Sequence, residues 1–172
     1  MKQSIVFLML AACGGYPPNA LCVNVSTDAE VMACVTETLN KAAGCELVTV
    51  AGSTITTQSG TVADVSFVTS INEPLPSYDK GGTIVGFTKF DSAGRANVRI
   101  VVQPFAAFDE STTLMHELGH VFGLYFPDDK GDEAHSSNPS DIMFHESPGY
   151  LTTDNVKAYV AELDAQGKGC AQ

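Results

Sequence analysis

Two histidines and a glutamate at a fixed spacing are the residues of this chain best suited to chemistry. They lie in residues 116–123, which read H-E-x-x-H-x-x-G. Residues four apart share one face of a helix, so His116 and His120 can offer two imidazoles to one metal ion. Glu117 would then be placed to take a proton from a metal-bound water. Gly123 can end the helix in a backbone conformation that other residues resist.

A catalytic zinc ion usually has three protein ligands and keeps a fourth position open for water. All the histidines of the chain lie between positions 116 and 145, so His135 and His145 are the first candidates for the third ligand. The alternative to a metal site is an amphipathic helix that carries two incidental histidines.

The motif and the residues after it resemble the metzincin zinc peptidases, where a third ligand and a methionine turn follow. In that family the third ligand comes three residues after the glycine, where this chain has Phe126, which cannot bind zinc. Residues 135–143 (H-S-S-N-P-S-D-I-M) are similar to the matrixin segment from the third histidine to the methionine. The resemblance therefore implies that His135 is the third ligand and that residues 124–134 contain an insertion. Such a loop can still return to the metal, because loop closure costs rise slowly with length.

Two flanking stretches extend the resemblance to about residues 27–167. Residues 63–67 (A-D-V-S-F) are similar to an alternating strand of the matrixin branch, and residues 151–156 are similar to the start of its last helix. The resemblance implies a zinc endopeptidase that hydrolyses peptide bonds of extracellular or envelope proteins. Zn²⁺ on three imidazoles would activate a water, and Glu117 would take its proton and pass it to the leaving amine.

The resemblance also implies roles around the metal. Met143 would lie below the imidazoles as an apolar floor rather than as a ligand. The strand expected at 83–90 would be the edge to which an extended peptide substrate adds. Residues after Met143 would wall the substrate pocket on the primed side: Phe144, Pro148 and Tyr150.

Several of these assignments have alternatives. His135 could be a surface residue, with Asp128 or Asp129 as the third ligand. His145 is expected to be a polar cleft or surface residue rather than a ligand. The acidic residues of the insertion could bind Ca²⁺, although an acidic loop is more often only solvated; they are Asp128, Asp129, Asp132 and Glu133.

A catalytically inactive relative, used as a surface binding module, is the main functional alternative. The displaced third histidine motivates it. The intact Glu117 argues against it, because a structural zinc site has no need of that carboxylate.

Length and composition predict one folded domain. The chain has 172 residues, of which 44% are hydrophobic and 17% are charged. Its formal net charge of −11 gives it no electrostatic attraction for nucleic acid, and an anionic membrane would repel it. The partner that the resemblance implies is a peptide or protein substrate. Oligomeric state stays open.

The first residues predict export. Residues 1–12 are interpreted as an export signal, because one lysine precedes a short apolar run. Leu-Ala-Ala-Cys at 10–13 resembles the lipobox of bacterial lipoproteins, so 13–26 is interpreted as a lipid anchor and tether. An ordinary secretory signal or a disordered start is the alternative. We expect an exported protein, either an envelope lipoprotein or secreted, that contacts a membrane only through a lipidated Cys13.

Four cysteines remain for disulfides: Cys22, Cys34, Cys45 and Cys170. An exported domain can use two disulfides. A bond between Cys34 and Cys45 is disfavoured, because about 16 Å of helix rise would separate them. Two pairings remain open.

Residue patterns predict a single α+β domain over 27–172, and the resemblance implies that it is metzincin-like, with an upper part to about 123 and a lower part over 124–172. The upper part is a mixed twisted sheet backed by two helices, and the lower part is a small irregular subdomain with a C-terminal helix. Residues 54–60 could be a strand or a loop. The other expected elements are a helix at 28–43, strands at 46–51, 63–68, 83–90 and 97–103, a loop at 72–82, a turn at 91–94 and a helix from about 109.

Overall fold

The computed structural model describes residues 22, 25–71, 85–102, 110–123, 135–136, 141–143, 155, 157 and 160–161. Its elements are, in chain order, α1 (Asp28–Ala43), β1 (Val48–Ala51), β2 (Thr54–Thr57), β3 (Val62–Val68), β4 (Gly86–Phe90), β5 (Ala96–Val101) and α2 (Glu110–Val121). The predicted α+β class is confirmed, since the five strands form one mixed sheet and two helices accompany it. The described residues 155, 157, 160 and 161 are helical, whereas most of the expected lower part lies outside the described residues.

Helix α1 has the bounds that its sequence predicts because both of its ends are capped. The Thr27 hydroxyl accepts a hydrogen bond from the Glu30 backbone N–H, and the Glu30 carboxylate accepts one from the Thr27 N–H, which completes a capping box. At the other end Gly44 has a φ of 72°, a left-handed conformation that favours glycine.

The sheet has the strand order β1-β2-β3-β5-β4. Strand β3 pairs in parallel with β5, and all other pairs are antiparallel. Residues 54–57 are thus strand rather than loop, and β4 and β5 form the predicted hairpin. The turn between them is held by Asp91, whose carboxylate accepts from the N–H groups of Ala93 and Arg95. Strand β4 begins at Gly86, later than expected, and lies at one edge of the sheet.

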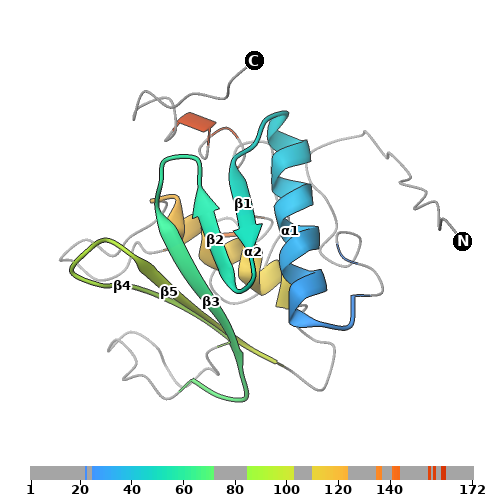
Figure 1. The fold of residues 1–172 in the computed structure, drawn as a ribbon, viewed down its shortest axis with the longest axis vertical. Coiled ribbons are helices and arrows are strands. Elements are labelled where there is room, and N and C mark those ends of the chain that lie inside the picture. The colour runs from blue at the N-terminus through green and yellow to red at the C-terminus, as the bar shows by residue number, and fades with distance from the viewer. Residues whose placement is uncertain are drawn as a thin grey trace, which may run out of the picture.

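One face of the sheet is buried and carries both helices. Small and branched apolar residues alternate along this face with polar residues on the other; the buried ones are Val48, Ile55, Ala63, Val65, Ala96, Val98 and Ile100. Helix α1 contacts β1, α2 contacts β4 and β5, and the helices contact each other. Figure 1 shows α1 beside β1 and α2 running behind the strands. Because cross-strand partners share a face, Gly86 and Thr88, opposite Ile100 and Val98, lie on the helix side of β4.

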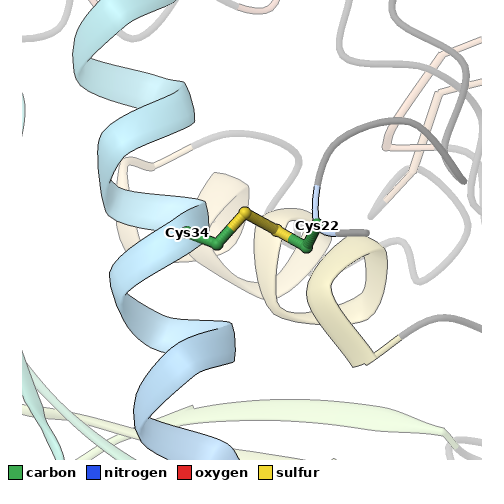
Figure 2. Close-up of a disulfide and its surroundings, with 2 residues drawn as sticks. All are labelled: Cys22 and Cys34. Atoms are coloured by element: carbon green, nitrogen blue, oxygen red, sulfur yellow. A yellow bond between two sulfur atoms is a disulfide. The ribbon is translucent and has the colours of Figure 1, made fainter. Parts of the chain in front are cut away.

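A disulfide joins Cys22 to Cys34 on α1 (Figure 2). This is part of one of the two pairings that the sequence left open. Cys45 is also disulfide-bonded. Cys22 is buried in the core, so the stretch expected to be a tether is fastened to α1 before its end. Disulfide bonding indicates an oxidising, extracellular type of environment.

Among the residues that the structure describes, neither helix combines the length and apolarity that a membrane crossing requires. The expected export signal and Cys13 lie outside the described residues, so lipidation stays a prediction.

Candidate metal centre

Two of the expected ligands project from α2 toward the same point. Helix α2 is firmly held against the sheet, since Leu114, Met115 and Leu118 have no exposed surface. His116 and His120 lie one turn apart on this helix, and their ring centroids are 5.1 Å apart. The predicted sharing of one helix face is thereby confirmed.

His135 lies beside these two histidines, although it comes later in the chain than the third ligand of the usual motif. Its ring centroid is 5.2 Å from that of His116 and 5.2 Å from that of His120. Each of the three residues offers one ligand atom, and these atoms lie within 4.8 Å of one another. Tetrahedral ligands of one zinc ion are about 3.4 Å apart, which is inside this limit. The three imidazoles could therefore hold a metal ion.

The hydrogen bond of His116 Nδ1 decides which ring nitrogen is free to bind a metal. His116 Nδ1 lies 2.7 Å from the carbonyl oxygen of Ile142. A carbonyl can only accept, so Nδ1 carries the proton and donates it. Nε2 then keeps its lone pair for a metal. Hydrogen bonds of this kind orient metal-binding histidines and raise their basicity.

Hydrogen bonds hold the segment that ends at Met143, both within the segment and to residues outside it. The Asp141 carboxylate accepts from the Met143 N–H at 2.8 Å and from the Asn155 side-chain amide at 2.8 Å. The Ser136 N–H donates to the Met143 carbonyl at 2.9 Å, which ties the neighbour of His135 to this turn. Met143 is completely buried, as an apolar floor would be.

Asp141 and Asn155 were not among the residues selected from the sequence. Asp141 could have been found, because aspartate commonly accepts from the backbone two residues further on, and it lies two positions before Met143. Asn155 gives no such local signal, since its partner is distant in the chain.

Glu117 is buried against strand β4. Its Oε2 accepts a hydrogen bond of 2.6 Å from the Thr88 hydroxyl. Its Oε1 lies over Gly86, so closely that a Cβ on that residue would collide with it. Burial raises the pKa of Glu117 to about 7, while the Thr88 hydrogen bond acts in the opposite direction. Neither Thr88 nor Gly86 was expected at the site, because only the strand register places them beside α2.

The remaining predicted site residues lie outside the described residues. This holds for the pocket residues Phe144, Pro148 and Tyr150, for His145, and for the whole insertion 124–134. The assignments of Ca²⁺ to the acidic loop, and of Asp128 or Asp129 as an alternative ligand, therefore stay predictions.

Comparison of the chain with family models, with curated proteins and with solved structures finds no match. Function must accordingly be inferred from the residues of the site and from the fold that brings them together.

Proposed function

We propose that this protein is an exported zinc endopeptidase of matrixin-like metzincin type that hydrolyses peptide bonds in extracellular or envelope proteins. One observation carries the proposal: His116, His120 and His135 converge, and the residue next to His116 is a buried carboxylate. Three imidazoles with a neighbouring glutamate form the donor and base set of a hydrolytic metal site.

The donor set favours zinc. Imidazole ligands suit Zn²⁺, and three protein ligands leave a position for water, as catalytic zinc sites require. The hydrogen bond from His116 Nδ1 to Ile142 orients one of these ligands. When bound, Zn²⁺ would lower the pKa of its water and polarise the carbonyl of the scissile bond.

Glu117 supplies the proton transfers in this proposal. Its carboxylate takes a proton from the attacking water and then delivers it to the departing amine nitrogen. A carboxyl group serves both steps well when its pKa is close to the working pH. Burial raises the pKa of Glu117 to about 7 in the metal-free chain, and a bound zinc ion would lower it from there.

Strand β4 is the expected substrate edge. It is one of the two edge strands of the described sheet, and α2 packs against it. An extended peptide that added to this edge would lie next to the helix that carries Glu117. The contacts of Glu117 with Thr88 and Gly86 support this arrangement, because they bring the proposed base to the same strand.

The proposed location rests on the expected export signal and on the cysteines. The bond between Cys22 and Cys34 supports an oxidising compartment. An anchor at Cys13 would hold the domain at a membrane, while the net charge of −11 disfavours nucleic acid as a partner.

Zinc content and peptide cleavage test the proposal. Bound zinc is measured by elemental analysis, and cleavage of a mixed peptide library is followed by mass spectrometry. Wild type is expected to bind one zinc ion per chain and to cleave peptides. Glu117→Ala should retain zinc and lose at least about 100-fold in kcat, since it lacks the base. His135→Ala should lose both zinc and cleavage, whereas His145→Ala serves as the matched control.

Each alternative gives a different result. A wild-type protein without zinc and without cleavage would indicate a binding module. Full activity in His135→Ala would instead indicate that an aspartate of the 124–134 insertion is the third ligand.

A further inference from the structure

The carboxylate of Glu117 lies against strand β4 with both oxygens, and one of them accepts a hydrogen bond from that strand. Thr88 donates to Oε2 at 2.6 Å, and the Thr88 hydroxyl also lies 3.4 Å from the Glu117 backbone carbonyl. The other oxygen, Oε1, lies against the Cα of Gly86. These two contacts come from a strand that is separated from Glu117 by about thirty positions.

Side-chain atoms of α2 fill the space over Gly86. A Cβ there would be 2.7 Å from Thr113 Cγ2 and closer still to Glu117 Oε1. A side chain at position 86 would therefore displace the Glu117 carboxylate and the Thr113 methyl group from their places against β4. Because Gly86 has ordinary strand pairing with Ile100, the reason for glycine here is the close approach of the carboxylate.

Successive side chains of β4 point to opposite faces of the sheet, and this alternation places Gly86 and Thr88 on the same face. Gly86 and Thr88 are two apart, so both point toward α2, while Phe87 and Lys89 point to the other face. A hydroxyl and a missing side chain on adjacent positions of one face fit the two oxygens of a single carboxylate.

We propose that Thr88 is a positioning residue for the catalytic carboxylate, and that Gly86 provides the space this position requires. The proposal rests on the endopeptidase function proposed above. A glutamate side chain has several rotatable bonds, and a proton can be transferred efficiently only when the accepting oxygen is held near the water. The Thr88 hydroxyl removes this freedom by fixing Oε2.

The alternative is that Thr88 merely satisfies a buried polar group. Thr88→Val keeps the shape of the side chain and removes its hydroxyl, whereas Thr88→Ser keeps the hydroxyl and removes a methyl group. Thr56→Val, at a half-buried threonine of β2, is the matched control. For each full-length variant we would measure zinc content, Tm, kcat and KM.

A positioning role predicts that Thr88→Val loses about 10- to 100-fold in kcat, with KM and zinc content close to wild type. Thr88→Ser should recover kcat to within about threefold of wild type, since the donor remains. Gly86→Ala should reduce kcat in the same way, because its methyl group displaces Oε1. Wild-type kcat in Thr88→Val, or an equal loss of kcat in Thr88→Ser, would overturn the proposal.

A second measurement separates this proposal from the proposed function. The ¹³C signal of the Glu117 carboxyl carbon, assigned by its absence in Glu117→Gln, reports the hydroxyl contact without any catalysis. It should move in Thr88→Val and stay unchanged in Thr88→Ser and Thr56→Val. If wild type cleaves no peptide, the endopeptidase proposal fails, and the positioning of the carboxylate is then decided by this signal alone. An unmoved signal in Thr88→Val would refute it.

Discussion

Glu117 is ionisable and almost completely buried, two properties that are seldom found together. Among the residues that the structure describes, Thr88 donates the hydrogen bond that partly offsets its loss of hydration. Proteins place ionisable groups in this way chiefly at sites of function, since a buried charge lowers stability. The same burial that suits proton transfer therefore has a thermodynamic cost that can be measured.

We expect this cost to appear as a pH dependence of stability in protein stripped of metal by a chelator. In the unfolded chain Glu117 loses its proton near pH 4.5, whereas in the folded chain it keeps it to about pH 7. The folded state binds more protons in this interval, so the free energy of unfolding falls as pH rises through it. The decrease due to Glu117 should be at most about 3 kcal/mol.

Urea unfolding at several pH values would measure this decrease. Histidines titrate in the same interval, so the informative quantity is the difference between wild type and Glu117→Gln. Glutamine has no proton to lose, and the variant should show a flatter dependence. Equal slopes in the two proteins would mean that Glu117 is not buried as described.

At the residue scale the sequence predicted the parts of the site that are governed by local spacing. His116 and His120 follow from the helical repeat, and His135 follows from its resemblance to a segment that ends in methionine. Thr88 and Gly86 could not be found in this way. Their role depends on the register between β4 and β5, which no short motif encodes.

At the scale of elements, the turn at residues 141–143 contacts both the neighbour of His135 and helix α2. Asp141 holds this turn through the Met143 N–H and Asn155, and the turn presents the Ile142 carbonyl to His116. Loss of the Asp141 carboxylate would free the turn and, with it, the orientation of the His116 ring.

Asp141→Ala is therefore expected to weaken zinc binding about 10- to 100-fold while all three histidines remain. Competition with a chromogenic chelator would measure the affinity. Asp91→Ala is the control, because the Asp91 carboxylate likewise accepts two hydrogen bonds at a turn, in its case both from backbone N–H groups, but lies in the β4–β5 hairpin. Equal zinc affinity in Asp141→Ala and wild type would show that the turn does not orient the ligand.

Element bounds were predicted best where side chains determine them locally. Helix α1 is delimited by Thr27 and Gly44, and both of these caps can be read from the sequence. Strand β4 was expected at 83–90, but its pairing with β5 begins at Gly86. Such a boundary is set by the partner strand, so composition alone could not give it.

At the scale of the whole molecule, the predicted mixed sheet with two helices is correct because alternating and helical patterns fix which faces are buried. Which cysteines pair could not be decided from the sequence, since pairing depends on how the chain before α1 returns to that helix. Cys22 is bonded to the half-buried Cys34 of α1, and so joins the N-terminal segment to the core. If the first residues held the domain to a membrane, a force on that anchor would reach the core through the bond between Cys22 and Cys34.

The bond between Cys22 and Cys34 is accordingly expected to stabilise the domain. It closes a loop with a sequence separation of 12, for which loop entropy predicts about 3 kcal/mol. The double variant Cys22→Ala/Cys34→Ala should lose about 2–4 kcal/mol in the free energy of unfolding, measured by urea titration without reductant.

Cys13→Ala is the control, because Cys13 precedes this loop and is expected to be the lipid anchor. The His116–His120–His135 group lies on other elements, so a folded double variant should still bind zinc. A double variant as stable as wild type would show that the bond does not restrain the unfolded chain.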